Sequence, residues 1–332
     1  MAKKARNKSE SKVRQPVEGT GHSRQKCVEC ESKAVISLSY GPHRFCKKHF
    51  LHFFEKRVRR TIRENRLVEG REKIVAAYSG GKDSGTTLFI LKNIFGKSNP
   101  IEALLVDEGI SGYRDKALDI AEKNCKKWKV PFKRVSFAEE FGFTMVDVMR
   151  KTGAKKEIGS TCAYCGVLRR QLLNKHAKKM GAAKIATGHN LDDEAQSVLM
   201  NVCDADLLHF ARLGPKSPGT GGMVPRIKPL CLCPENEVIS FAQFAGIMHY
   251  SGQCCPFKWQ AKRNDFRGIL NHLEASYPGT MFSIMRFFQQ VKPLAFEKLG
   301  KKELFSCEKC GEPSSEKECK ACKMAERIAG KG

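Results

Sequence analysis

The segment at residues 73–95, KIVAAYSGGKDSGTTLFILKNIF, constrains the fold more than any other part of the chain. The apolar run at 74–78 predicts a buried strand, the Gly- and Ser-rich run at 79–84 predicts a turn, and the following apolar spacing predicts a helix. Gly80 and Gly81 let the backbone bend tightly, so that successive N–H groups and the positive helix end converge on one anion. The segment therefore predicts a phosphate-binding turn between a strand and a helix.

The side chains of this turn suit a nucleotide polyphosphate. Ser79 and Ser84 can donate O–H hydrogen bonds, and Lys82 adds a positive charge. Asp83 can bond the N–H groups of the turn or hold Mg²⁺ against the phosphates. The spacing differs from that of the ATPase P-loop, in which Gly-Lys-Ser/Thr follows four free residues. SGGKDS resembles instead the PP-loop of enzymes that split ATP between its α and β phosphates and leave an adenylated substrate.

Strand and helix patterns alternate after the turn. Apolar runs at 101–107, 132–137 and 184–187 predict strands, and residues 113–128 and 160–180 predict helices. This alternation predicts an α/β fold with a doubly wound parallel sheet, which binds nucleotides at the carboxyl ends of its strands. The residues at strand ends that we predict to contact ATP are Asp107, Gly109, Gly188 and His189.

The charge of the chain points to a polyanionic partner. The formal net charge is +25 over 332 residues, and the first 26 residues hold only eight of the 60 Lys and Arg. A folded surface of this sign suits polyphosphates and, above all, nucleic acid. We find no apolar run of membrane-spanning length and no apolar signal-peptide core, so we predict a cytoplasmic protein without a membrane partner.

Fifteen cysteines in a chain predicted to be cytoplasmic indicate metal or redox chemistry rather than disulfides. Two sets of ligands have the paired spacing of a zinc ribbon. These sets are Cys27, Cys30, Cys46 and His49, and Cys307, Cys310, Cys319 and Cys322. Each predicted Zn²⁺ has four protein ligands and no place for water, so both ions are predicted to be structural.

Two further motifs begin predicted helices. Cys162 and Cys165 form a Cys-x2-Cys pair at a helix start, where the dipole stabilises thiolates and favours sulfur chemistry or metal ligation. The run GHNLDDEAQ at 188–196 begins another helix. We interpret Asp192 as a helix cap and Asp193 as a residue of the nucleotide crevice.

These patterns predict four segments. They are a basic flexible arm at 1–26, a zinc ribbon with a basic helix at 27–66, a PP-loop ATP-binding catalytic domain at 67–300, and a second zinc ribbon at 301–332. Within the third segment, residues 213–230 are rich in Gly and Pro and show no periodicity. They predict an irregular loop, either beside the active site or elsewhere on the surface.

In this order, a zinc ribbon, SGGKDS, Cys-x2-Cys-Gly, GHNLDDEAQ, the Cys-Pro of 255–256 and a terminal ribbon resemble the PP-loop tRNA 2-thiouridine synthetases of archaea and the eukaryotic cytosol. The resemblance covers residues 27–322. It implies the PP-loop ATP pyrophosphatase fold, adenylation by ATP of the C2 oxygen of a tRNA uridine, and replacement of that oxygen by sulfur. It also implies that Asp193 is the catalytic acid.

We further predict that Cys162, Cys165 and Cys255 hold a 4Fe-4S cluster, in which three protein thiolates leave one iron open to bind hydrosulfide. Cys255 is preferred over Cys254 because relatives carry the ligand directly before Pro. The main alternative is a persulfide on one cysteine, resolved by another without iron. Cys254 could replace Cys255 or carry that persulfide.

The resemblance leaves the substrate position and the partners open. The segment CGVLRRQ, with Arg169 where some relatives have Lys, favours the wobble uridine over the T-loop uridine. Because Arg keeps the charge but cannot act as a base, we assign Arg169 to electrostatic work on phosphate. The sulfur donor is either inorganic sulfide or a ubiquitin-like carrier. The assembly is open between a homodimer and a heterodimer with a paralogue.

Two other functions compete with thiolation. An ammonia-using amidation enzyme shares the PP-loop, but it requires neither three cysteine-rich sites nor so basic a surface. A zinc-dependent RNA-binding adaptor would need no catalysis, and the intact SGGKDS together with Asp193 argues against it.

Overall fold

The computed structural model describes residues 26–154, 160–219, 221–252, 255, 261–299 and 304–330. The chain divides into two compact units, 1–49 and 50–332. Apart from Lys26, the predicted basic arm lies outside the described residues, and so does Cys254. No helix in the described part of the chain is long and apolar enough to cross a membrane.

The first unit contains a small antiparallel hairpin. Its strands are β1 (Ile36–Ser37) and β2 (Arg44–Phe45), with Ile36 opposite Phe45. Helix α1 (Lys47–Glu64) begins in this unit and continues into the second. Phe54, in the second unit, stacks on Phe241 with ring centroids 4.5 Å apart, so the apolar face of α1 belongs to the core of that unit.

The second unit is built on a six-stranded sheet of order β5-β4-β3-β6-β8-β7. The strands are β3 (Ile74–Ala77), β4 (Ile101–Asp107), β5 (Phe132–Ser136), β6 (Lys184–Ala186), β7 (Lys216–Ser217) and β8 (Arg226–Ile227). All neighbouring strands are parallel except the edge pair β7–β8. The order reverses at β3, which confirms the predicted doubly wound α/β sheet.

The prediction of an irregular loop at 213–230 is wrong in part, because β7 and β8 lie within it. Each strand has two residues, too few to show an alternating pattern. Backbone hydrogen bonds hold them in the sheet, such as the one from Thr187 N to Ile227 O at 2.9 Å.

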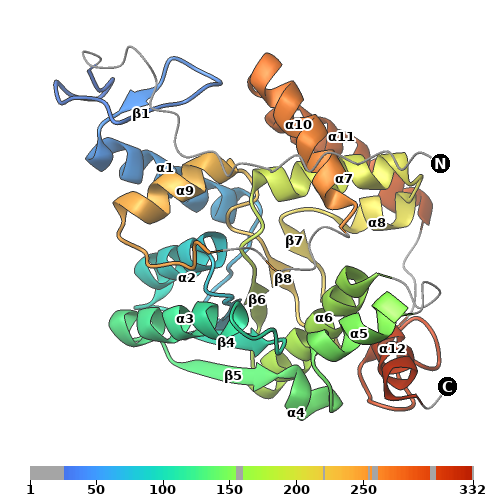
Figure 1. Cartoon of the computed structure of the whole chain (residues 1–332). Helices are drawn as coiled ribbons and strands as arrows, with labels where there is room; N and C mark the ends of the chain where they lie inside the picture. Colours follow the sequence, from blue (N-terminus) through green and yellow to red (C-terminus); the bar gives the residue numbers. More distant parts are fainter. Residues whose placement is uncertain are drawn as a thin grey trace, which may run out of the picture. The chain divides into compact units, whose positions relative to one another are not determined.

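Helices of the second unit pack on the sheet and beside it (Figure 1). They are α2 (Lys82–Phe95), α3 (Arg114–Trp128), α4 (Phe137–Phe141), α5 (Met145–Ala154), α6 (Thr161–Lys179), α7 (Leu191–Cys203), α8 (Leu207–Arg212), α9 (Glu235–Phe244), α10 (Arg263–Ser276), α11 (Thr280–Leu299) and α12 (Lys320–Ala329). Helices α7, α8, α10 and α11 share a core of their own, in which Phe210 meets Phe288 edge to face.

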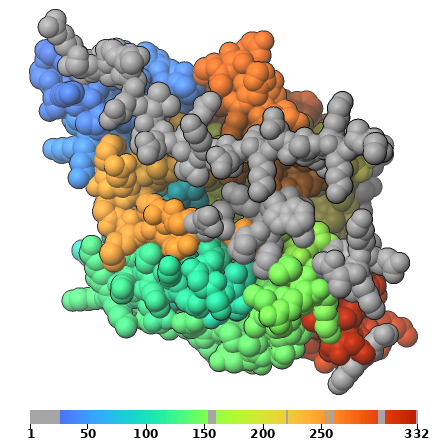
Figure 2. Space-filling view, in the orientation of Figure 1, coloured from blue at the N-terminus to red at the C-terminus, as the bar shows by residue number. Residues whose placement is uncertain are grey.

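The C-terminal segment, with β9 (Phe305–Ser306), β10 (Pro313–Ser314) and α12, packs on α5 and α6. Figure 2 shows this red segment against the green surface formed by α5. Met324 and Ile328 of α12 join the same core as Leu172 and Leu173 of α6. The segment therefore shares the core of the sheet domain.

Candidate active site

Two glycines shape the phosphate-binding turn by close backbone contact. Gly80 has φ of +80°, and a Cβ there would lie 1.9 Å from the carbonyl oxygen of Ala117. A Cβ on Gly188, after β6, would lie 2.6 Å from the backbone nitrogen of Ser84. Larger side chains would therefore fill the space in which the turn approaches α3 and the end of β6. The residues present fit a backbone cradle for phosphate.

Hydroxyl and guanidinium groups hold the turn in place. Ser84 Oγ lies 2.9 Å from Ser79 Oγ and donates to the carbonyl oxygen of Gly81 at 3.2 Å. The buried Arg114 donates to the carbonyl oxygens of Ser79 and Val106, each at 2.9 Å. The turn is thus fixed to β4 before any nucleotide binds, which lowers the ordering cost of binding.

Lys82 and Asp83 form a charged group with residues distant in sequence. Lys82 Nζ lies 3.0 Å from Asp83 Oδ2 and 2.7 Å from Glu235 Oε1, and Asn190 Nδ2 donates to Asp83 Oδ1 at 3.0 Å. Burial alone would lower the pKa of Lys82, but the two carboxylates outweigh it and raise that pKa. Burial raises the pKa of Asp83 despite Lys82. The carboxylate oxygens fit Mg²⁺, and Lys82 stays charged for a phosphate.

At the start of α7, the cap is formed by Asn190 and Asp193 rather than by Asp192. Asn190 and Asp193 form a reciprocal capping box, with Asp193 N donating to Asn190 Oδ1 at 3.0 Å. Asp193 also pairs with Arg263 at 3.2 Å. Asp192 instead accepts a hydrogen bond from the backbone nitrogen of Glu235 at 2.7 Å, so its interpretation as the helix cap is wrong. The catalytic role of Asp193 stays a prediction.

The predicted cluster cysteines lie near one another. Cys162 and Cys165 occupy the first turns of α6, and Cys165 and Cys255 pack against the same apolar core. Burial raises the pKa of Cys165 to about 11, with Arg169 opposing the shift. Among the described residues, these three sulfurs do not form a set within 4.8 Å of one another. These three cysteines are therefore less tightly grouped than either predicted zinc-ligand set.

A chain of ion pairs links the turn to these cysteines. Arg169 donates to Cys165 Sγ at 2.9 Å and pairs with Glu108 Oε1 at 2.7 Å. Glu108 is 2% exposed and also pairs with Arg114, which bonds Ser79. Glu108 raises the pKa of Arg169, which therefore stays cationic. Arg169 thus lies between a carboxylate and a thiol, and its predicted contact with phosphate stays a prediction.

The other residues predicted to contact ATP lie at the same strand ends. Asp107 pairs with Arg134 at 2.6 Å and accepts from Gly109 N at 2.9 Å. His189 Nδ1 lies 2.9 Å from Thr187 Oγ1, and burial first, then the charge of Lys228, lowers the pKa of His189 to about 4. His189 is therefore neutral at pH 7.

The structure brings each predicted zinc-ligand set together. In both sets, four ligand atoms lie within 4.8 Å of one another. In the first set Cys27 Sγ lies 3.4 Å from His49 Nδ1 and Cys30 Sγ lies 3.9 Å from Cys46 Sγ; in the second, Cys310 Sγ lies 3.7 Å from Cys319 Sγ. Three sulfurs and one nitrogen, or four sulfurs, fit a closed tetrahedral Zn²⁺ site. Gln171 of α6 donates to Cys310 Sγ at 3.2 Å.

Comparison with known proteins identifies the family. Residues 50–267 match the PP-loop domain family. The tRNA 2-thiolation protein NcsA of Haloferax volcanii is 37% identical, covering 91% of this chain and 98% of that protein. The chain belongs to the PP-loop family of tRNA 2-thiolation enzymes. Another member, the tRNA-5-methyluridine(54) 2-sulfurtransferase of Pyrococcus horikoshii, is 36% identical over 90% of this chain and 93% of its own.

A solved structure of the same family supports the fold. It is the U34-tRNA thiolase NcsA from Methanococcus maripaludis with its [4Fe-4S] cluster. The TM-score is 0.78 at 29% identity, covering 91% of this chain and 96% of that chain. The predicted membership in the tRNA 2-thiolation family is therefore confirmed.

Sequence reasoning missed three side chains of this family site: Glu108, Asn190 and Glu235. Each contacts a residue that the sequence had singled out, namely Arg169, Asp83 and Lys82. Only Asn190 carries a local signal, because Asn followed three residues later by an acidic residue is typical of a reciprocal helix cap.

Asp192 should give this family member a distinctive pH dependence of stability. Burial first, then Glu235 and Asp193, raises the pKa of Asp192 to about 6. The folded state then binds a proton that the unfolded state has lost, so stability falls as the pH rises from about 4 to about 6. Asp192→Asn removes this loss of stability, and the amide oxygen of Asn can still accept the hydrogen bond from the backbone nitrogen of Glu235. We expect the free energy of unfolding of Asp192→Asn at pH 7 to exceed that of the wild type by on the order of 1 kcal/mol.

Urea unfolding at several pH values measures this difference. Asp206→Asn is the matched control, because hydrogen bonds from His209 lower the pKa of Asp206 and make its contribution opposite in sign. That contribution is present above the ordinary pKa and is lost as the pH falls. A constant difference between Asp192→Asn and the wild type from pH 4 to pH 7 would contradict the assignment.

Proposed function

We propose that this protein is an ATP-dependent tRNA sulfurtransferase that adenylates the C2 oxygen of the wobble uridine and replaces it with sulfur. One observation carries the proposal: a continuous series of contacts runs from the phosphate-binding turn at Ser79 through the buried Arg114 and Glu108 to the exposed Arg169 and the partly buried Cys165. Adenylation needs a pyrophosphate cradle, and sulfur insertion needs a sulfur-handling group close by. Ser79 follows β3 and Glu108 follows β4, so the contacts pass along the carboxyl ends of these strands to α6, which supports the proposal.

The residues of the turn would bind and orient ATP. Backbone N–H groups at Gly80 and Gly81 would bind phosphate, Lys82 would neutralise charge, and Asp83 would hold Mg²⁺. The C2 oxygen attacks the α phosphate, pyrophosphate leaves, and the oxygen becomes part of a good leaving group. Sulfur then attacks C2, and AMP departs with the original oxygen. Asp193 would act as the acid in this crevice.

Cys162, Cys165 and Cys255 would hold the 4Fe-4S cluster. When bound, the cluster supplies an iron without a protein ligand, which can activate sulfur as the nucleophile. Arg169 keeps a permanent positive charge beside Cys165 and favours its thiolate form.

The wobble position rests on two observations. The segment CGVLRRQ contains Arg169, and the structural relative is named as a U34-tRNA thiolase. A relative of 36% identity is named for position 54, so that position is the competing assignment. Mass spectrometry of tRNA from a deletion strain distinguishes them. Loss of thiolation at position 54 alone would overturn the wobble assignment.

Further proposals complete the description. We assign structural Zn²⁺ to both ribbon sites, sulfide or a ubiquitin-like carrier to sulfur supply, and the cytoplasm as the compartment. We also retain the four-segment division at 26, 66 and 300, and assembly with a second copy or a paralogue.

ATP–pyrophosphate exchange stimulated by tRNA tests the catalytic assignment. We expect exchange in the metal-loaded wild type and its loss in Asp83→Asn, which keeps the size of the side chain but removes the charge that would hold Mg²⁺. A zinc-dependent RNA-binding adaptor would bind tRNA without consuming ATP. That result in the metal-loaded protein would replace the enzyme proposal with the adaptor.

A further inference from the structure

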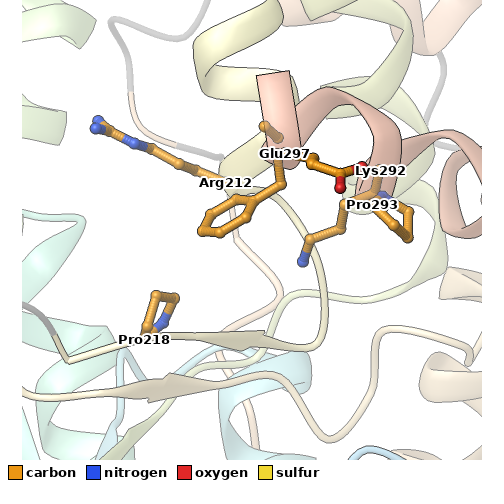
Figure 3. A pocket seen from close by; sticks show the side chains of 7 residues that line it. Arg212, Pro218, Lys292, Pro293 and Glu297 are labelled. Atoms are coloured by element: carbon orange, nitrogen blue, oxygen red, sulfur yellow. The ribbon is translucent and has the colours of Figure 1, made fainter. Parts of the chain in front are cut away.

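A cavity of about 590 Å³ lies between α8, the loop that follows it, and α11. Figure 3 shows Arg212, Pro218 and Lys292 around the open space. Phe296 of α11 also lines the cavity, and 43% of its surface is exposed. An exposed aromatic ring therefore lines this cavity together with two prolines, the cations of Arg212 and Lys292, and the carboxylate of Glu297.

A second cavity of about 570 Å³ shares Lys292 with the first. Phe288, Lys292 and Phe296 are four residues apart on α11, so one face of that helix lines both spaces. Arg60 of α1 and Pro215 of the loop also line the second cavity. We call the two cavities together the α11 groove. Phe296 is exposed in it, whereas Phe288 is buried beneath Lys292.

The α11 groove adjoins the candidate active site. The backbone nitrogen of Lys228 donates to the carbonyl oxygen of Pro215, which lines the second cavity, at 2.8 Å. Lys228 and Glu194 pair at 2.8 Å and also influence His189, one of the residues predicted to contact ATP. Lys292 itself donates to the carbonyl oxygen of Leu213 at 2.6 Å, which fixes the loop against α11. A strand bound in the groove would therefore lead toward the start of α7.

We propose that the α11 groove binds unpaired nucleotides of the tRNA substrate, with the ring of Phe296 stacking on one base and Arg212 contacting an adjacent phosphate. The proposal rests on the tRNA substrate of the proposed function and deepens it. Aromatic faces stack on any unpaired base, and RNA-binding proteins recognise single-stranded loops in this way. A cavity of this volume is in the size range of small-ligand sites. The net charge of +25 supplies the complementary field.

The test is fluorescence anisotropy with labelled tRNA transcripts and the full chain. Phe296→Ala should weaken tRNA binding at least about fivefold, because one base loses its stacking partner. Phe287→Ala is the matched control, since Phe287 lies on the same helix, is 59% exposed and lines neither cavity. Phe296→Trp keeps an aromatic ring at this position and should bind tRNA about as tightly as the wild type. Neither variant should change the affinity for a short RNA duplex.

The charge in the groove has its own test. Arg212→Gln should weaken tRNA binding and lower the slope of log affinity against log salt by about one unit. Arg286→Gln, an exposed change on α11 that lies outside both cavities, should alter the slope less.

The outcomes separate this inference from the proposed function. A wild type that binds no tRNA overturns both. A wild type that thiolates tRNA, with equal tRNA affinities for Phe296→Ala and Phe287→Ala and equal thermal stability, overturns the groove alone. A change in oligomeric state in Phe296→Ala without a change in tRNA affinity also overturns it, and would make the groove a contact between copies.

Discussion

Gly80→Ala should lower the affinity for ATP more than about 100-fold, as measured by titration calorimetry. The backbone there has φ of +80°, which costs a residue with a Cβ about 1–2 kcal/mol. The added Cβ would also lie 1.9 Å from the carbonyl oxygen of Ala117, a backbone atom that cannot rotate away. The turn must therefore move, and its N–H groups lose their common direction.

Gly181→Ala is the control for conformation alone. Gly181 has φ of +70°, but a Cβ there would meet nothing within 4 Å. We expect it to lose about 1 kcal/mol of stability and to bind ATP normally. Equal losses of ATP affinity in the two variants would show that the approach of the turn to α3 is unimportant.

Cys255→Ala should remove the proposed iron-sulfur cluster while leaving ATP binding intact. Anaerobically purified wild type should contain about four irons per chain, and Cys162→Ala, Cys165→Ala and Cys255→Ala should each contain less than about one. A cluster with only two remaining protein thiolates is held too weakly to survive purification. Iron analysis and the visible spectrum measure the loss, and ATP titration checks that the PP-loop is unaffected.

Cys203→Ala provides the matched control, because Cys203 is exposed at the end of α7 and should leave the iron content unchanged. Zinc should be retained in every variant. Iron-free wild type with full thiolation activity and a trapped persulfide on one of the three cysteines would replace the cluster with the persulfide mechanism.

The parts of the site that the sequence predicts are those built from adjacent residues. SGGKDS predicts the turn because strand, glycines and helix follow one another, and the structure has that junction at Ser79 to Ser84. The paired spacing of the cysteines likewise predicts the two four-ligand sets, and in the structure the ligand atoms of each set lie within 4.8 Å of one another. Local order fixes local geometry in both cases.

Contacts between distant residues carried no such signal. Lys82 and Glu235 are 153 residues apart, and nothing near Glu235 marks it as a partner of the turn. Glu108 follows the predicted strand end at Asp107 by one residue, yet its burial between Arg114 and Arg169 depends on how α3 and α6 cover the sheet. The contacts of Glu235 and Glu108 depend on tertiary packing, which the pattern of a single sequence does not predict.

Helix α6, which has 19 residues, links the proposed cluster site to the proposed C-terminal zinc site. Its first turns carry Cys162 and Cys165, and farther along Gln171 bonds Cys310 and Asn174 bonds Glu312 of the C-terminal segment at 2.6 Å. Zinc binding at the proposed ribbon site would be folding energy, so protein without zinc would leave one side of α6 unsupported. Under the proposed assignments, zinc must therefore bind before the cysteines at the start of α6 can hold iron. We expect protein made in a cell short of zinc to lose its iron.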